Sequence, residues 1–330
     1  MSARFSACFM ARTVALGLAL AGILGVQSAS AADAPKTPVT VQAGFIPVTD
    51  VAALYLGDEV GIFKKHGIDL KVNMGTTGAA LVPAVMSGEY NFAFSSLVSL
   101  LQARDKGLPV KIIAAGSSST ATRGADVTMI HAGPKSGITS AKGLEGKTVS
   151  VNALNGLLQL LGSIAVKSDG GDPAKVRFIE LGFADALAAL QSGKTDAMVG
   201  AEPFGTAAIA AGYPAINSPY LDMSKSSMLT SAYFTFEDQL AKNPDLFKNL
   251  RAAINESLDY AQGHPDEVRK QLPKFTKLGP EVAAKLILPT YLTAVPKDSI
   301  EIFSKYAKEF GLIGKPTVYE DIVWSEAQSK

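Results

Sequence analysis

The sequence has very little cysteine: a single residue, Cys8, among 330 positions. Cys8 precedes an apolar run from Val14 to Val26, which the small-x-small segment Ala29-Ser30-Ala31 follows. This arrangement predicts a secretory signal peptide over residues 1–31, because the run is too short to span a membrane as a mature helix. The mature chain would then contain no cysteine, which excludes disulfides, thiolate catalysis, cysteine-based metal sites and a lipid-anchored cysteine at the cleavage point.

The sequence also lacks an excess of either charge, a further long apolar run and clustered histidines. Lysine plus arginine number 31 and aspartate plus glutamate 30, without a basic block, which argues against nucleic acid as a partner. No second apolar run reaches membrane-spanning length, so we expect a soluble exported monomer. His66, His131 and His264 are too scattered along the chain for a metal site, and no cofactor is expected.

One stretch of the chain is repeated. Ser87–Ser96 reads SGEYNFAFSS, and 105 residues later Ser192–Ala201 reads SGKTDAMVGA. The register holds without a gap from Ala79/Ala184 to Pro109/Pro214, with seven of 31 positions identical. Each copy predicts a helix that ends at Ser-Gly, a short strand and a second helix that stops at Gly-x-Pro. A period this long is too large for a solenoid and predicts two lobes built on one plan.

Strands alternate with helices along most of the mature chain, which predicts an α/β fold with mostly parallel sheets covered on both faces. The strands are expected at residues 39–45, 68–72, 92–94, 110–115, 127–131, 148–151, 176–180 and 228–236. From Glu237 the pattern is helical, with breaks at Asn243-Pro244, His264-Pro265 and Gly279-Pro280. We predict lobe 1 from residues 32–124 and 235–330, lobe 2 from residues 125–234, and two crossings, near Gly124 and Tyr233.

Several motifs resemble the nitrate/sulfonate/taurine type of periplasmic binding protein, whose members bind taurine, alkanesulfonates, nitrate or pyrimidine precursors of thiamine. They are residues 44–47, 53–56, 61–69, 81–88, 151–155 and 202–204, which read GFIP, ALYL, GIFKKHGID, LVPAVMSG, VNALN and EPF. The resemblance covers nearly all of the mature chain. It implies a two-lobed type II periplasmic binding-protein fold with a two-strand hinge, capture of a small molecule in the periplasm and delivery to an ABC permease.

In open α/β sheets ligands sit outside the carboxyl ends of the strands, so the loops of two facing lobes converge on one cleft. The predicted ligand-binding residues on these loops are Asp50, Thr76, Ser95, Ser96, Asn152, Asn155 and Glu202. No residue is assigned a catalytic or metal-binding role.

All of these candidates except Thr76 also have a structural alternative. Asp50, Ser95 and Ser96 are good helix N-caps, and Glu202 would complement the dipole of a helix that Pro203 begins. One of the two asparagines would be structural and the other would point a donor and an acceptor at the ligand.

The predicted set contains two carboxylates, several hydroxyls and amides, and at most one arginine nearby, Arg123. Such a set is poorly suited to binding nitrate alone. A neutral heterocycle or a molecule with an amino group fits better, since its donors would meet Asp50 or Glu202. A zwitterion such as taurine also fits, with its sulfonate on helix N-termini and its ammonium on a carboxylate. Sulfonates, aminosulfonates and pyrimidine-like heterocycles therefore all remain open as ligands.

Two other functions would use the same cleft. The resemblance extends to the eukaryotic synthase of the thiamine pyrimidine, an enzyme on this fold whose cysteine-rich motif the mature chain does not have. The third interpretation is a protein that presents its ligand to a sensor receptor. No nucleophile elbow or histidine-centred triad stands out in the sequence, so a non-enzymatic binding protein is expected.

Overall fold

The computed structural model describes residues 37–276 and 278–329, all within the unit Thr37–Lys330. The predicted signal peptide, residues 1–31 with Cys8, lies outside the described residues. Within the described part of the chain, no helix is long and apolar enough to cross a membrane.

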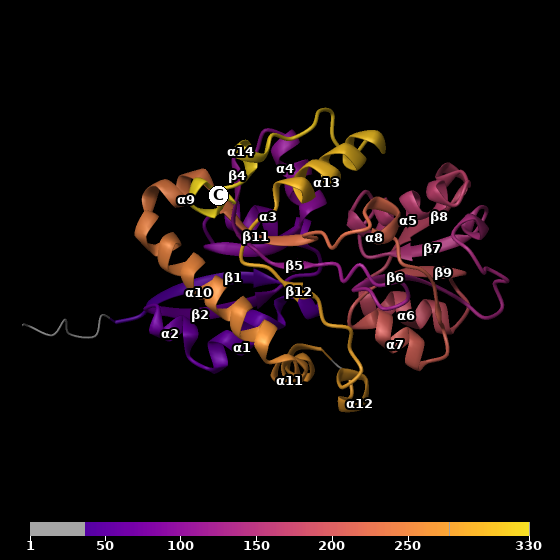
Figure 1. Ribbon diagram of the computed structural model, residues 1–330, viewed down its shortest axis with the longest axis horizontal. Coiled ribbons are helices and arrows are strands. Elements are labelled where there is room, and N and C mark those ends of the chain that lie inside the picture. The colour runs from indigo at the N-terminus through magenta and orange to yellow at the C-terminus, as the bar shows by residue number, and fades with distance from the viewer. Residues whose placement is uncertain (1–36, 277, 330) are drawn as a thin grey trace, which may run out of the picture. The chain divides into compact units, whose positions relative to one another are not determined.

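The first sheet has five strands in the order β2-β1-β3-β11-β4 (Figure 1). They are β1 (Val39–Phe45), β2 (Ile68–Met74), β3 (Phe92–Ser96), β4 (Val110–Ala115) and β11 (Ser231–Phe236). β1 pairs in parallel with β2 and β3, whereas β11 is antiparallel to β3 and β4. The strands predicted at residues 39–45 and 110–115 are confirmed to the residue, because both are runs rich in β-branched and apolar side chains.

The second sheet also has five strands, in the order β10-β6-β9-β7-β8. They are β6 (Thr128–Ala132), β7 (Thr148–Val151), β8 (Arg177–Glu180), β9 (Ala197–Ala201) and β10 (Ala215–Asn217). β7 pairs in parallel with β8 and β9, and β6 is antiparallel to β9 and β10. The predicted α/β class with mostly parallel sheets is therefore confirmed.

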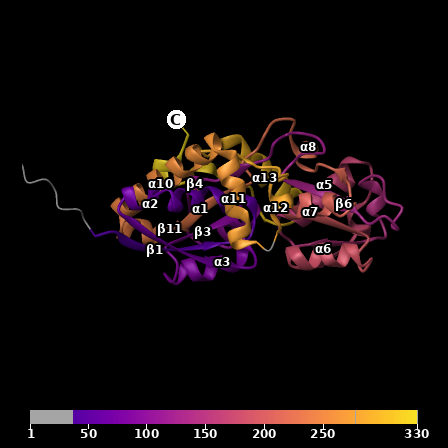
Figure 2. The ribbon, with the colours of Figure 1, turned by 90° about the horizontal axis from the view of Figure 1, so that it is seen from below.

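Helices lie on both sides of each sheet. The helices between the strands are α1 (Ala52–Glu59), α2 (Ile62–Lys65), α3 (Gly78–Met86), α4 (Leu97–Asp105), α5 (Leu157–Ser168), α6 (Phe183–Gln191), α7 (Phe204–Ala210) and α8 (Tyr220–Met223). Figure 2 shows α3 on one side of the first sheet and α1 with α10 (Pro244–Gly263) on the other.

The repeat in the sequence is a repeat in the structure. Strand β3 and strand β9 are offset by 105 residues at both ends, and so are α3 and α6. Each strand lies in the middle of its sheet, between a parallel neighbour and an antiparallel one. The duplication therefore places equivalent loops at the same edge of the two sheets.

The chain passes between the sheets twice, and the two crossing segments are hydrogen-bonded to each other. The amide of Ser119 donates to the carbonyl of Met228 at 2.9 Å, and the amide of Thr230 donates to the carbonyl of Ser117 at 2.9 Å. The return crossing ends just before Ser231, close to the predicted position near Tyr233, and all of β11 belongs to the first sheet. The lobe boundaries at residues 124 and 234 remain predictions.

Three of the C-terminal helices begin at the prolines of the predicted breaks, Pro244, Pro265 and Pro280. The C-terminal helices are α9 (Glu237–Lys242), α10, α11 (Pro265–Phe275), α12 (Pro280–Ala283), α13 (Lys297–Glu309) and α14 (Tyr319–Ile322). Helices α10 and α11 pack on α1, α13 packs on α4 and α14 on β4, whereas α12 contacts α7 (Figures 1 and 2). A strand that the sequence did not predict, β12 (Thr290–Tyr291), pairs with β5 (Ser117–Ser118) in the first crossing segment.

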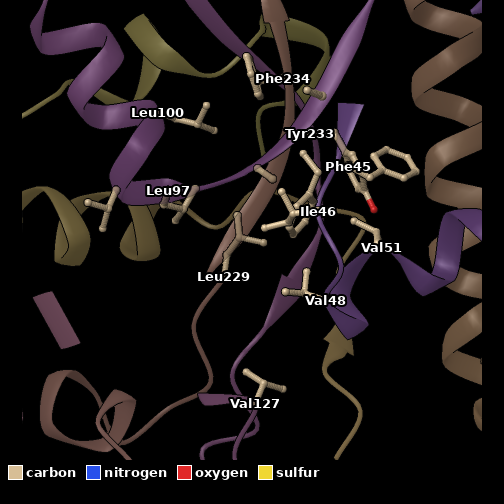
Figure 3. Packing of buried hydrophobic residues seen from close by; sticks show 14 of the residues in the cluster. Phe45, Ile46, Val48, Val51, Leu97, Leu100, Val127, Leu229, Tyr233 and Phe234 are labelled. Atoms are coloured by element: carbon tan, nitrogen blue, oxygen red, sulfur yellow. The ribbon is translucent and has the colours of Figure 1, made fainter. Parts of the chain in front are cut away.

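An aromatic cluster fills the core beneath the carboxyl ends of the first sheet. The ring of Phe45 meets the rings of Phe92 and Tyr233 at centroid distances of 6.0 and 6.2 Å, and Tyr233 also meets Phe94 at 5.4 Å. Figure 3 shows Ile46 beside this cluster, at the point where β1 ends. The loop that follows β1 therefore lies on a buried, apolar base.

Candidate ligand-binding site

A cavity of about 320 Å³ lies where loops at the carboxyl ends of strands from both sheets meet. From the first sheet it is lined by the loop after β1, the start of α3, the end of β3 and one face of α4. From the second sheet it is lined by the start of β6, the loop between β7 and α5, and the first residue of α6. This is where two facing α/β sheets are expected to hold a ligand.

Some of the seven predicted residues line this cavity and the others do not. Four of them line this cavity: Asp50, Ser96, Asn152 and Asn155. The other three, Thr76, Ser95 and Glu202, are not among its lining residues. Whether a residue lines the cavity depends on the direction in which its side chain leaves the backbone. The sequence does not reveal that direction.

Asp50 lies in a 3-10 turn, Thr49–Val51, and is only 9% exposed. The prediction that it caps a helix is wrong, because the N-cap positions of this turn and of α1 are Val48 and Val51. Its carboxylate instead accepts a hydrogen bond from the Ser117 hydroxyl. Burial raises the pKa of Asp50, and the bond from Ser117 offsets part of that rise.

The neighbouring serines have different roles. Ser96 is the N-cap of α4, where its Oγ accepts the Ser99 amide at 3.3 Å. Ser95 is a fully buried strand residue and caps no helix, contrary to the prediction. Its side chain is turned towards Gly78, where an added Cβ would lie 2.3 Å from the Ser95 hydroxyl oxygen. Ser95 therefore shapes the cavity wall only indirectly.

The two threonines before α3 also differ. Thr77 is the N-cap of α3, and its Oγ1 accepts the amide of Ala80 at 3.2 Å. It lines the cavity, whereas the predicted Thr76 is exposed and does not. The correct loop was predicted, but the adjacent residue faces the cavity.

Glu202 points back into the second sheet's own core. Its Oε1 accepts the amide and the hydroxyl of Thr206 at 3.1 and 2.9 Å, so it stabilises the first turn of α7. Pro203 is the N-cap of α7 and not its first residue, as the sequence had suggested. Glu202 is 1% exposed, and burial raises its pKa from 4.5 to about 8. Glu202 is therefore a structural residue at the start of α7, but as a largely neutral acid and not as a charge on the helix dipole.

The loop between β7 and α5 forms the opposite wall of the cavity. Asn155 has a left-handed backbone with φ of 57°, a conformation that asparagine tolerates better than most residues. Its carbonyl accepts a hydrogen bond at 2.9 Å from Nε2 of Gln102 on α4, and its amide donates to Oε1 of Gln159 at 2.7 Å. The Gln102–Asn155 bond is thus a direct polar link across the cavity.

Gln102 belongs to a stripe that the sequence analysis missed. Ser96, Ser99, Gln102 and Lys106 follow one another at intervals of three, three and four residues, and all four line the cavity. This spacing places them on one face of α4, which is otherwise rich in apolar residues. The sequence could have predicted this stripe, since polar side chains at helical spacing within an apolar helix indicate a face in contact with solvent.

Aromatic side chains complete the lining. Phe94, Phe183 and Tyr220 contribute to the wall, and Phe183 stacks on Phe204 at a centroid distance of 5.5 Å. Among the described residues that line the cavity, the only charged ones are Asp50 and Lys106, and none is histidine, cysteine or arginine. Across the described residues, no group of three or more His, Cys, Asp or Glu side chains is arranged to hold a metal ion.

We expect Gln102→Ala to weaken ligand retention, because it removes the side-chain bond to Asn155 across the cavity and leaves Asp50 in place. A hydrogen bond of this kind contributes about 0.5–1.5 kcal/mol, so the dissociation rate should rise roughly two- to tenfold. Stopped-flow release of a bound ligand measures this rate. Glu89→Gln is the control, because Glu89 is exposed and does not line the cavity. Equal release rates in Gln102→Ala and the wild type would contradict the linking role.

A family model described as NMT1/THI5 like matches residues 48–268, and the chain belongs to this NMT1/THI5-like family. Among curated proteins it is similar to the 4-amino-5-hydroxymethyl-2-methylpyrimidine phosphate synthases THI5 and THI12 of Saccharomyces cerevisiae. The identity is 24% over 234 residues, which cover 67% of this chain and 66% of each synthase. The chain thus spans just under two thirds of the length of these relatives.

Solved structures show the same fold. The periplasmic aliphatic sulphonate binding protein SsuA of Escherichia coli matches with a TM-score of 0.71 at 17% identity, covering 89% of this chain and 94% of its own. The periplasmic nitrate-binding protein NrtA of Synechocystis PCC 6803 matches with a TM-score of 0.72 at 16% identity, covering 88% and 87%. The predicted two-lobed periplasmic binding-protein fold is therefore confirmed.

Proposed function

We propose that this protein is the extracytoplasmic solute-binding component of an ABC import system, which captures a small polar organic molecule and delivers it to an inner-membrane permease. The observation that carries the proposal is the cavity itself. It lies at the carboxyl ends of two sheets built on one plan, and Gln102 on one side bonds to Asn155 on the other. Structures of the same fold include a ligand-binding component of an ABC-type import system from Staphylococcus aureus, with a TM-score of 0.75 at 15% identity and coverage of 87% of this chain and 97% of its own.

The site residues and the location belong to the same proposal. We assign ligand contact to Asp50, Ser96, Asn152 and Asn155, which line the cavity, and add Gln102 and Tyr220. The apolar run of residues 14–26 with its cleavage site supports export to the periplasm, where the protein would act as a monomer without a lipid anchor.

The charges of the cavity favour a ligand that carries hydrogen-bond donors. Among the described residues that line the cavity, Asp50 is the only acidic one and Lys106, which follows the last residue of α4, the only basic one. A bare anion such as nitrate would be repelled by the Asp50 carboxylate, whereas an amino group would find a hydrogen-bond acceptor there. An amino-substituted heterocycle, or an aminosulfonate with its sulfonate towards Lys106, therefore fits better than nitrate or a simple alkanesulfonate.

The alternative is an enzyme that acts on a pyrimidine, because the curated relatives are named as synthases. Catalysis needs a nucleophile or a general base within reach of the substrate. The described residues that line the cavity offer only one carboxyl group, Asp50, and no histidine or cysteine. This chemistry favours binding without turnover.

A thermal-shift screen of the mature protein tests the proposal. The compounds are 4-amino-5-hydroxymethyl-2-methylpyrimidine, taurine, ethanesulfonate and nitrate. A true ligand at about 100 times its dissociation constant should stabilise the fold by roughly 2.7 kcal/mol, which raises the melting temperature by a few degrees. Recovery of the bound compound unchanged after prolonged incubation would separate binding from catalysis. A chemically altered compound would contradict the proposal of a binding protein. An unchanged melting temperature with every compound would count against this ligand class.

A further inference from the structure

The two carboxylate oxygens of Asp50 lie in different surroundings. Oδ1 accepts a hydrogen bond from the hydroxyl of Ser117, which belongs to β5 in the first crossing segment. Oδ2 accepts no hydrogen bond from the described residues, yet it is not one of the fully buried oxygens that lack a partner. Since Asp50 lines the cavity, Oδ2 is accessible from the cavity. One oxygen is therefore bound to the crossing segment, and the other is left for a ligand.

Ser117 is itself held from both sides of its strand. Its carbonyl accepts the amide of Thr230 in the return crossing at 2.9 Å and the hydroxyl of Thr230 at 3.1 Å. On the other side β5 pairs with β12, where Ser117 lies opposite Tyr291 (Figure 1). The side chain of Ser117 is also fully buried. Its hydroxyl therefore reaches Asp50 from a backbone whose position is fixed by two neighbouring segments.

Tyr291 joins the same strand pair to the turn that contains Asp50. The hydroxyl of Tyr291 donates to the carbonyl of Thr49 at 3.1 Å, and its amide accepts support from α10, donating to Oε1 of Gln262 at 2.8 Å. Tyr291 is only 6% exposed. Its side chain thus bonds to the residue before Asp50, and its strand pairs with the residue that bonds to the Asp50 carboxylate. The strand pair β5–β12 therefore holds both the backbone and the side chain of this turn.

The charge of Asp50 has no cationic partner within the described part of the protein, since no ion pair there includes it. Burial, and to a smaller extent the charge of Asp50, raises the pKa of three nearby phenols, those of Tyr220, Tyr233 and Tyr291. Burial also raises the pKa of Asp50, and the bond from Ser117 is the largest cause that lowers it. Ser117 therefore favours the ionised carboxylate, which can accept a donor from a ligand.

We propose that Ser117 and Tyr291 are positioning residues that leave Asp50 with one free oxygen, so that the site selects a ligand with a single amine donor over a ligand with two parallel donors. The selectivity rests on the function proposed above and specifies which ligands the same cavity accepts. An ammonium or amino group places one N–H on one oxygen, whereas a guanidinium pairs two parallel N–H groups with both oxygens of a carboxylate. At Asp50 the second arrangement would have to displace the Ser117 hydroxyl.

Two compounds that differ only in their cationic group, taurine and guanidinoethanesulfonate, test this selectivity by calorimetric titration. A hydrogen bond to a charged group is at stake, so we expect the wild type to bind taurine roughly tenfold or more tightly than its guanidino analogue. Ser117→Ala should weaken taurine binding and reduce the preference for taurine severalfold, because Oδ1 becomes available. Ser117→Thr keeps the hydroxyl and should restore the preference.

Ser119→Ala is the matched control for Ser117→Ala. Ser119 lies in the same crossing segment and is also buried, but its Oγ accepts the amide of Met228 at 3.1 Å and does not contact Asp50. A merely structural role of the crossing serines would make the two variants behave alike. We expect instead that Ser119→Ala loses stability and keeps the preference for taurine.

Crystal structures of the unliganded wild type and of Ser117→Ala test the positioning role without any ligand. We expect Oδ1 of Asp50 to face Ser117 in the wild type and the carboxylate to take another orientation in the variant. Tyr291→Phe, which removes the bond to the Thr49 carbonyl, gives a second test, because it should shift the turn that contains Asp50.

An Asp50 carboxylate with the same orientation in the wild type and in Ser117→Ala overturns the inference. An equal or higher affinity of the wild type for guanidinoethanesulfonate also overturns it but leaves the binding function intact. So does a preference for taurine that Ser117→Ala leaves unchanged. Failure of taurine and of every other compound in the thermal-shift screen to bind counts against the proposed function, and the crystal structures then decide the positioning role.

Discussion

Glu202→Gln is expected to make the folded protein more stable than the wild type at pH 8 and equally stable near pH 4. The carboxyl group has a pKa of about 8 in the folded chain against 4.5 ordinarily, because burial disfavours its ionised form. Below pH 4.5 both states are protonated, and stability from this group is fully present. As pH rises towards 8 the unfolded chain ionises first, so stability falls by up to about 1.4 kcal/mol per pH unit. Above pH 8 the loss levels off.

Glutamine is a neutral match for the protonated acid and keeps an acceptor for Thr206, so the variant should lack most of this slope. Urea unfolding at pH 4.5, 6 and 8 gives the free energies of unfolding that are compared. Glu89→Gln is the control, because Glu89 is exposed and its substitution should leave the pH dependence of the wild type unchanged. Parallel pH curves for Glu202→Gln and the wild type would show that Glu202 ionises normally in the folded protein.

The second large effect is expected on binding. Asp50→Asn keeps an acceptor oxygen for the Ser117 hydroxyl but removes the only acidic charge among the described residues that line the cavity. A hydrogen bond to a charged group contributes about 1.5–3 kcal/mol, so the dissociation constant of a ligand with an amino group should rise roughly 10- to 150-fold. Isothermal titration calorimetry of the wild type and the variant measures this ratio.

Ser96→Ala is the matched control for Asp50→Asn. Ser96 also lines the cavity, but its hydroxyl caps α4, so its loss should cost about 1 kcal/mol of folding stability. The two variants should therefore differ in which property they lose. Asp50→Asn should bind poorly and fold well, whereas Ser96→Ala should fold less stably and keep more of its affinity. Unchanged affinity in Asp50→Asn would remove Asp50 from the recognition site and count against a ligand with an amino group.

The sequence by itself determined the architecture. The 105-residue repeat predicted two sheets built on one plan, and α3 with α6 and β3 with β9 keep that offset. Prolines predicted where α10, α11 and α12 begin. These features are readable because strand and helix periods, caps and helix breaks depend on residues close together in the chain.

Only the tertiary structure decided which side chains meet at the cavity. Asp50 finds its partner Ser117 67 residues away, and Gln102 reaches Asn155 53 residues away. Glu202 was correctly placed at the end of a strand, but its side chain turns under α7 and away from the cavity lining. Such contacts depend on how two sheets pack and on which rotamer a side chain adopts there. Loop position follows from local sequence, whereas side-chain direction at a loop follows from the packing of distant segments.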